Sequence, residues 1–398
     1  MITFMQQNSQ RNTYIFFLLS LLFFGTATAL FRGVLDNYLA NELLVSKAHR
    51  GVVEFFREMP GLLLFLILAL FYRTSERRIF QIGYGIALIG IICFMSVGLH
   101  LIPAILSLTV WSTGQHLIMP VRQSYAVHSA VPGKEGAALG TMRSVQSIGR
   151  VLGFFLVPLI FLIASKGMGF DYAFIGVIIL VIGALVASFF LESNTTNVER
   201  QRLYFRKKYK TYYILQSFYG ARKQVFITFA PYVLILQYGA SASVIASLMG
   251  LSAALNIFGA PLIGKVIDNV GFKAVMVGDT IILFFVCLFY GFAHHLFPSH
   301  VAYIVVCSTY IVDNLISNAS MAASVYVKHL SDDRDEMTAT LTTGISLDHL
   351  ISIFIALIGG IIWEYLGVEI LFTLAAVMAI MNSLIALTIR SDKSVATE

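Results

Sequence analysis

The stretch GKVIDNVGFK (Gly264–Lys273) is a short polar segment between two long apolar runs, at about residues 241–266 and 274–293. Glycines stand on both sides of Asp268, and Lys273 closes the stretch. Glycine permits a tight turn, and an aspartate can cap a neighbouring helix or pair with a cation. Each flanking run is close to the ~20 residues that a helix needs to cross a ~30 Å hydrocarbon core. We therefore predict a tight loop between two membrane-spanning helices.

The same alternation of apolar run and short polar break continues along the whole chain. Helices are expected, because membrane strands would be shorter and would alternate in polarity. The apolar runs lie at about residues 13–34, 52–71, 79–98, 101–124, 138–163, 172–191, 212–238, 241–266, 274–293, 301–327, 338–362 and 369–389. The sequence thus predicts an all-α polytopic membrane protein with 12 transmembrane helices.

Composition supports this class. The 398 residues are 58% hydrophobic and only 12% charged, whereas a soluble domain carries about 25% charged residues. The net charge of +6 does not indicate nucleic-acid binding, because the cations fall mostly between apolar runs. The three cysteines lie within apolar runs without metal-ligand spacing. We expect reduced cysteines, no metal and no cofactor.

The first apolar run has two interpretations. Arg11 precedes it and the small residues Ala27, Thr28 and Ala29 lie near its end, which is typical of a cleavable signal peptide. The run of about 20 residues is also long enough to span a bilayer. We favour an uncleaved first span.

Basic residues predict the orientation, since cytoplasmic loops carry an excess of lysine and arginine. With the N-terminus inside, most cations fall on the cytoplasmic side, and only Lys47, Arg50 and Lys166 lie in the opposite loops. Both termini are then cytoplasmic, and we expect a multi-pass protein of the inner (plasma) membrane, acting as a monomer. The basic segment 192–211 is interpreted as a cytoplasmic linker between a six-helix bundle at 1–191 and a second at 212–398.

The chain resembles the major facilitator superfamily (MFS) of secondary transporters. Gly264, Asp268, Gly271 and Lys273 match the loop motif of that family, Gly-x-x-x-Asp-x-x-Gly-x-(Lys/Arg), whereas the corresponding stretch YRTSERRIF after the second run lacks the aspartate and both glycines. The resemblance implies two pseudo-symmetric six-helix bundles that rock around a central site, with helices 1, 4, 7 and 10 lining the cavity. It also implies gating contacts at the motif loop.

Ionisable residues inside the apolar runs are the candidate site residues, because burying a charge in a bilayer is unfavourable unless it faces water or a partner. Residues proposed to bind substrate are Lys223, Arg222, Arg150, Arg143, His116, Gln115, Gln216, Tyr219 and Asn314. Those proposed to carry a proton are Asp313, Asp348, Glu54 and Glu58. Gating is assigned to Arg57 on the outer side and to the four motif residues in their cytoplasmic loop. For each charged residue, a purely structural ion pair remains the alternative.

Neighbour relations along a helix suggest some partners. Arg222 and Lys223 are adjacent, so their side chains point about 100° apart, and only Lys223 lies on the polar stripe of its helix. We expect Arg222 to pair with Asp348 or Asp313, and Asp279 to pair with the motif loop. Arg143 and Arg150 are seven residues apart and share one helix face.

These observations favour a secondary transporter for a small anionic or zwitterionic organic solute, coupled to protons, with Na⁺ coupling left open. Midplane cations would bind the solute and midplane carboxylates would carry the proton. A proton-driven efflux pump for amphipathic drugs is the alternative, and an intramembrane transferase is a remote one. The sequence does not identify the solute or separate import from export.

Overall fold

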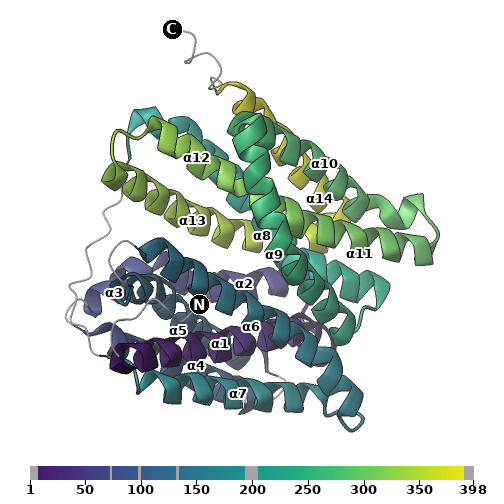
Figure 1. Ribbon diagram of the computed structural model, residues 1–398. Coiled ribbons are helices and arrows are strands. Elements are labelled where there is room, and N and C mark those ends of the chain that lie inside the picture. The colour runs from purple at the N-terminus through teal and green to yellow at the C-terminus, as the bar shows by residue number, and fades with distance from the viewer. Residues whose placement is uncertain (1–7, 72–73, 97–99, 131–133, 193–204, 390–398) are drawn as a thin grey trace. The chain divides into compact units, whose positions relative to one another are not determined.

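The computed structural model describes residues 8–71, 74–96, 100–130, 134–192 and 205–389, and every regular element within those ranges is a helix (Figure 1). Ten helical stretches in this part of the chain are long and apolar enough to cross a membrane. The protein is therefore a multi-pass helical membrane protein. Most of the segment 192–211, interpreted above as a linker, lies outside the described residues.

The helices follow the predicted apolar runs closely. The first half contains α1 (Asn8–Asn37), α2 (Lys47–Leu62), α3 (Leu64–Leu70), α4 (Glu76–Ser96), α5 (Leu101–His128), α6 (Glu135–Ile163) and α7 (Gly169–Ser188). The second half contains α8 (Lys210–Tyr238), α9 (Ala242–Val270), α10 (Phe272–Leu296), α11 (Ser299–Ile316), α12 (Met321–Leu330), α13 (Arg334–Leu366) and α14 (Val368–Leu387).

Two predicted spans are not among the ten. The run at 52–71 forms two helices, α2 and α3, which break at Leu63 just after Pro60. The run at 212–238 is the single helix α8, which carries Arg222 and Lys223 near its middle. The helices α2 and α3 have 16 and 7 residues and are each too short to span a bilayer alone, whereas the charged pair makes α8 less apolar than the ten. The count of twelve spans therefore stays a prediction.

The chain divides into two compact units. Unit 1 comprises residues 1–44, 56–200 and 241–253, and unit 2 comprises residues 45–55, 201–240 and 254–398. Each unit thus consists mainly of one half of the chain, with a short segment contributed by the other half. Each exchanged segment ends inside a helix: segment 45–55 ends within α2, and segment 241–253 ends within α9.

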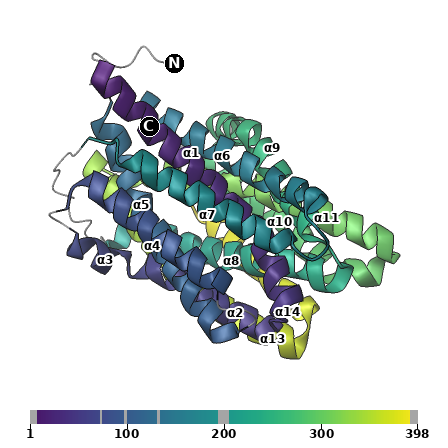
Figure 2. The same cartoon turned by 90° about the horizontal axis from the view of Figure 1, so that it is seen from below.

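In unit 1, α1 packs along α6 and α7, as both views show (Figure 1 and Figure 2). Gly153 of α6 allows close approach, because a Cβ there would overlap the backbone of Thr26 on α1. An aromatic cluster formed by Phe31, Phe94, Trp111 and Phe174 fills the space between α1, α4, α5 and α7.

In unit 2, α8 packs along α13, and α10 packs along α14 and α11 (Figure 1). The start of α2 also belongs to this unit. Gly51 and Gly360 bring it against the backbone of α13, and the Tyr232 hydroxyl donates a hydrogen bond to the Val45 carbonyl at 2.7 Å.

The motif loop is shorter than predicted. Residues 264–270 continue α9, and α10 begins at Phe272, so Gly271 alone makes the turn with a φ of +93°. Only glycine adopts this conformation without strain. Lys273 Nζ donates to the Ile389 carbonyl at 2.7 Å beyond the end of α14. Asp268 is exposed. Its side chain forms no ion pair or hydrogen bond with another described residue.

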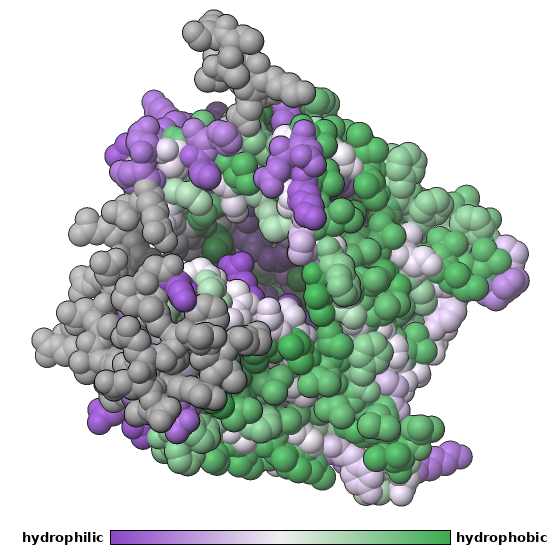
Figure 3. Space-filling model, in the orientation of Figure 1, coloured by the Kyte–Doolittle hydropathy of each residue, from purple (hydrophilic) through white to green (hydrophobic). Residues whose placement is uncertain are grey.

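Many large apolar side chains are exposed on the outward faces of α6, α7, α9, α10 and α14. Figure 3 shows hydrophobic residues across much of the surface in view. In water such exposure would be unfavourable, but it suits contact with lipid tails. The outer faces of the helices are therefore the lipid-facing surface.

Candidate functional site

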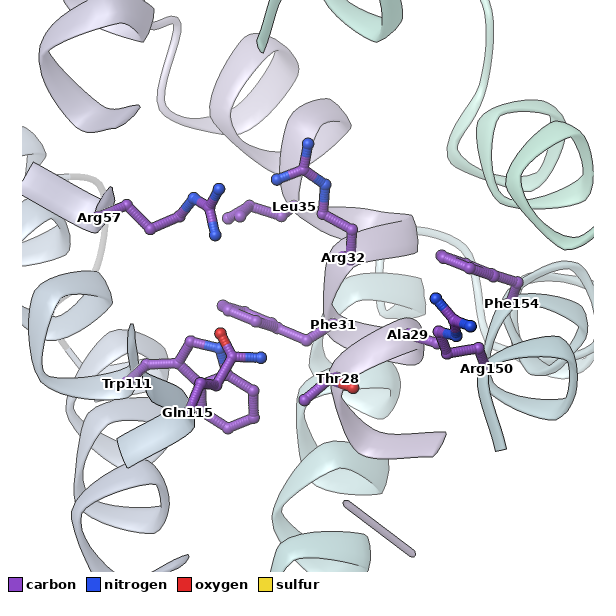
Figure 4. A pocket seen from close by; sticks show the side chains of 10 residues that line it. All are labelled: Thr28, Ala29, Phe31, Arg32, Leu35, Arg57, Trp111, Gln115, Arg150 and Phe154. Carbon is purple, nitrogen blue, oxygen red and sulfur yellow. The ribbon is translucent and has the colours of Figure 1, made fainter. Parts of the chain in front are cut away.

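A cavity of about 250 Å³ opens in unit 1, between α1, α5, α6 and the part of α2 that belongs to this unit. Three arginines line it, one each from α1, α2 and α6, and none of the described residues that line it is acidic. The lining residues are Thr28, Ala29, Phe31, Arg32, Leu35, Arg57, Trp111, Gln115, Arg150 and Phe154 (Figure 4). The cavity therefore combines aromatic walls with a concentration of positive charge.

Arg150 has the fewest protein contacts of the three. Its Nη2 donates to Ser147 Oγ on the preceding turn at 3.2 Å. Among the described residues, no carboxylate lies within ion-pair distance of it. Its guanidinium lies beside Phe154 (Figure 4). Arg143, predicted to share this face of α6, does not line the cavity, and Gln146 between them accepts hydrogen bonds from Arg122 at 2.9 and 3.2 Å when its amide is oriented to do so.

Arg57 and Glu58 form an ion pair at 2.5 Å between neighbours on α2, so the expected local neutralisation of one glutamate is present. The carbonyl of Arg57 accepts a hydrogen bond from the hydroxyl of Ser112 on α5. His116 lies one turn further along α5, and its Nδ1 is 2.9 Å from the Ser112 carbonyl. Gln115 faces the cavity, whereas the buried His116 packs behind it.

Glu54 lies on the same continuous helix, α2, one turn before Glu58. It belongs to unit 2, where both Glu54 and Arg50 are fully buried and pair at 3.0 Å. Gln224 of α8 donates to the other Glu54 oxygen at 3.0 Å and to Thr228 at 2.8 Å. Arg50 was expected in a loop and its role was missed, although its position one helical turn before Glu54 was a usable signal.

Lys223 pairs with Asp348 of α13. The approach of the two helices is close, since a Cβ on Gly220 would overlap Asp348. Lys223 keeps 29% of its side chain exposed while Asp348 is buried. The second oxygen of this carboxylate, Oδ1, has no hydrogen-bond partner among the described residues. Asp348 is therefore a buried acid, and its cationic partner Lys223 is partly exposed.

Arg222 pairs with Asp279 of α10 at 3.5 Å, so the expectation that Asp279 pairs with the motif loop is wrong. Asp348 is not its partner either, because that carboxylate binds Lys223. The predicted candidate Asp313 lies near enough to interact electrostatically with Arg222. The guanidinium also lies 5.1 Å from the centre of the Tyr219 ring, a cation–π distance. One buried cation thus faces two acids.

Amide side chains of α9 and of the turn after α11 form a fourth polar group in unit 2. Asn318 donates to Asn256 at 2.6 Å, and Asn256 lies 3.4 Å from the Asn314 carbonyl. Here α11 passes into α12 through a 3₁₀ turn at Ser317–Ser320, and Tyr219 donates to the Ser317 carbonyl at 3.4 Å. Gln216, also predicted to bind substrate, is half-buried two turns before Lys223. Asn256 was missed by the sequence analysis.

The chain was compared with known proteins. The family model described as Major Facilitator Superfamily matches residues 16–347. No curated protein sequence matches the chain.

Several solved structures share its fold at low sequence identity. The nucleoside transporter NupG aligns with a TM-score of 0.74 and 13% identity over 96% of this chain and 98% of its own. A D-xylose–proton symporter aligns with 0.72 and 13% over 95% and 97%, and a POT peptide transporter in complex with sulfate with 0.66 and 14% over 94% and 94%. At this identity the likeness concerns the fold alone. Since the family model covers most of the sequence, the chain belongs to the Major Facilitator Superfamily and is a transporter rather than an enzyme.

Proposed function

We propose that the protein moves a small anionic or zwitterionic organic solute across the inner membrane by alternating access, in exchange for or together with protons. The observation that carries the proposal is the cavity of unit 1, where the described lining residues include three arginines and no acid. Arg57 pairs with Glu58, whereas no carboxylate of the described residues lies within ion-pair distance of Arg150. In a site of low dielectric, an anionic solute would neutralise Arg150 while accepting paired hydrogen bonds.

The volume of the cavity supports a small solute. About 250 Å³ is slightly less than the ~300–1,000 Å³ of sites that enclose drug-sized ligands. Arg150 and Gln115 would contact the solute directly, and Arg32 and Arg57 would contribute to the positive potential. The remaining predicted residues, Arg143, His116, Gln216, Tyr219 and Asn314, stay candidates for contact with the solute during the transport cycle.

Proton coupling would use the pair of Lys223 and Asp348. In the charged state the two side chains neutralise each other, so Lys223 does not attract a solute. A proton on Asp348 would remove that attraction and leave a cation available to an anionic solute. Loss of the proton on the other side of the membrane would restore the pair and favour release. The acids Asp313, Glu54 and Glu58 are further candidates, and gating would involve Arg57 and the motif residues Gly264, Asp268, Gly271 and Lys273.

Reconstitution tests this proposal. Purified protein in liposomes, with an imposed pH or Na⁺ gradient, is offered labelled carboxylates, organic phosphates, amino acids and lipophilic cations. We expect an anion or zwitterion to accumulate under an inward proton gradient if it moves together with protons, or under an outward gradient if it exchanges for them, and in neither case when an uncoupler is present. Accumulation of lipophilic cations alone would contradict the proposed substrate class, and dependence on Na⁺ alone would contradict the proposed coupling ion.

Asp348→Asn separates coupling from binding in the same assay. The variant should lose proton-driven accumulation yet keep solute counterflow, which needs no net proton movement. Full proton-driven accumulation in this variant would remove Asp348 from the coupling step.

A drug exporter is the second candidate, and the observation that favours it is the aromatic wall of the cavity, formed by Phe31, Trp111 and Phe154. Flat apolar rings suit amphipathic compounds. The three arginines disfavour cationic amphipathic compounds. Transport of lipophilic cations in the assay therefore distinguishes a drug exporter from the proposed transporter of anions or zwitterions.

A further inference from the structure

Three side chains with metal-binding atoms meet where α10 ends and α14 begins, in unit 2. His294 and His295 lie in the last turn of α10, and Glu369 lies in the first turn of α14. The Nε2 atoms of the two histidines lie 3.1 and 3.0 Å from the same Glu369 oxygen, Oε1. The ligand atoms of all three residues lie within 4.8 Å of one another.

Helix packing holds this cluster in place. A Cβ on Gly291, one turn before the histidines, would contact Phe372 Cβ at 3.2 Å and Glu369 Cα at 3.6 Å. The rings of Tyr290 and Phe372 stack beside it with their centres 4.9 Å apart. The backbone of Glu369 is therefore fixed against α10, and the two imidazole rings lie 3.9 Å apart, centre to centre. The ligand atoms stand on two packed helices rather than on a loop.

We propose that His294, His295 and Glu369 bind one Zn²⁺ or a similar borderline divalent cation. Zinc binds imidazole nitrogen and carboxylate oxygen at ~2.0–2.2 Å, which at tetrahedral angles places neighbouring ligand atoms about 3.3–3.6 Å apart. The observed N···O separations of 3.0 and 3.1 Å are slightly shorter, so the ligand atoms would move apart a little on binding. An ion at this position would replace two hydrogen bonds by metal–ligand bonds and would need little rearrangement.

The donor set and its exposure define the class of ion. Two imidazoles and one carboxylate suit Zn²⁺, Ni²⁺, Cu²⁺ or Co²⁺ and suit Mg²⁺ and Ca²⁺ poorly. The His295 side chain is 59% exposed, so an ion can enter from solvent and keep a water ligand. The predicted topology places this end of α10 and α14 outside the cell. The ion would join α10 to α14 at that end and does not belong to the solute cavity.

The test uses the full-length protein in detergent, with any affinity tag removed and bound metal stripped by a chelator. Zn²⁺ binding is measured by competition with a fluorescent chelator, and Co²⁺ binding by the visible absorption that tetrahedral Co²⁺ shows. We expect one ion for each chain. Since loss of a residue that merely orients a ligand already weakens metal sites about 10–100-fold, His294→Gln, His295→Gln and Glu369→Gln should each weaken binding at least tenfold.

His300→Gln is the matched control, because His300 is an exposed histidine close by at the start of α11. It should leave both measurements unchanged. Each variant is first checked for wild-type elution and thermal unfolding without metal. Absence of stoichiometric Zn²⁺ binding in the wild type would overturn the proposal. So would tight binding that persists in the three ligand variants, or a loss in His300→Gln equal to theirs.

Discussion

At the scale of single residues, Arg150 is the most informative position for substrate binding. It lines the cavity, and within the described part of the chain it donates a hydrogen bond to the Ser147 hydroxyl and meets no carboxylate at ion-pair distance. A hydrogen bond to a charged group contributes about 1.5–3 kcal/mol, so we expect Arg150→Gln to lower the kcat/KM of uptake by roughly 10–100-fold. Arg150→Lys should recover part of the loss, because lysine keeps the charge but cannot make the paired contact.

The control for this prediction is Arg78→Gln, which removes an exposed arginine from the first turn of α4, away from the cavity. Its uptake should match the wild type at equal protein density. Equal losses in the two variants would mean that the effect of Arg150 is a general one of charge or folding.

Ion-pair partners on neighbouring helices were predicted least accurately from the sequence. Helical spacing tells which side chains share a face of one helix, but it does not tell which neighbouring helix that face meets. Asp279 was therefore given the wrong partner, because its carboxylate pairs with Arg222 of α8 and not with the motif loop. Those relations depend on packing that one sequence does not contain.

At the scale of helices, the bounds were predictable because apolar length is set by the bilayer. Predicted starts and ends differ from the observed ones by only a few residues for α4 and α9. The break at Leu63 and the 3₁₀ turn at Ser317–Ser320 were not predicted. Both lie inside apolar runs, where hydropathy is insensitive to the backbone path.

Close contact between the start of α2 and α13 gives a prediction at this scale. Gly51→Ala places a Cβ onto the Ala356 carbonyl, while Gly85→Ala on α4 places one where nothing lies within 4 Å. Both changes improve helix propensity by at most ~1 kcal/mol. Overpacking costs about 1–3 kcal/mol, so only Gly51→Ala should lower the apparent Tm in detergent. Equal shifts would mean that this contact is loose.

The ion pairs of Lys208, just before α8, give a second prediction at the scale of helices. Lys208 lies 2.8 Å from Glu336 and 2.9 Å from Asp332 at the start of α13, and hydrogen bonds to these carboxylates raise the lysine pKa above its usual value. The pKa of Lys208 is therefore higher in the folded than in the unfolded protein. Its contribution to stability is complete below pH ~10.4, the ordinary lysine pKa, and is lost only as the pH rises through the folded-state pKa.

We therefore expect Lys208→Gln to lower the apparent Tm by the same amount at pH 7 and pH 10, with a smaller difference only at higher pH. High salt should reduce the difference at every pH, because the cluster is partly exposed. Lys207→Gln, which changes the exposed neighbouring lysine, is the control. A difference that disappears by pH 9 would show that the pKa of Lys208 is not raised.

At the scale of the whole molecule, the number of membrane crossings is the open quantity, because the α2–α3 segment is divided into two short helices and α8 is less apolar than the ten candidate spans. Three cysteine substitutions in a background without Cys93, Cys287 and Cys307 resolve it. They are Lys166→Cys before α7, His300→Cys at the start of α11 and Asp332→Cys before α13. An impermeant maleimide applied to intact cells labels only external positions.

With twelve crossings and the N-terminus inside, positions 166 and 300 should be labelled and position 332 protected. If the α2–α3 segment did not cross, all three results would reverse. If α8 alone did not cross, position 166 would stay labelled while 300 and 332 exchanged behaviour. If neither crossed, only position 166 would change. Each arrangement gives its own pattern, and twelve crossings are the arrangement in which the buried charges of α2 and α8 lie at membrane depth, where they would need solute, protons or one another as partners.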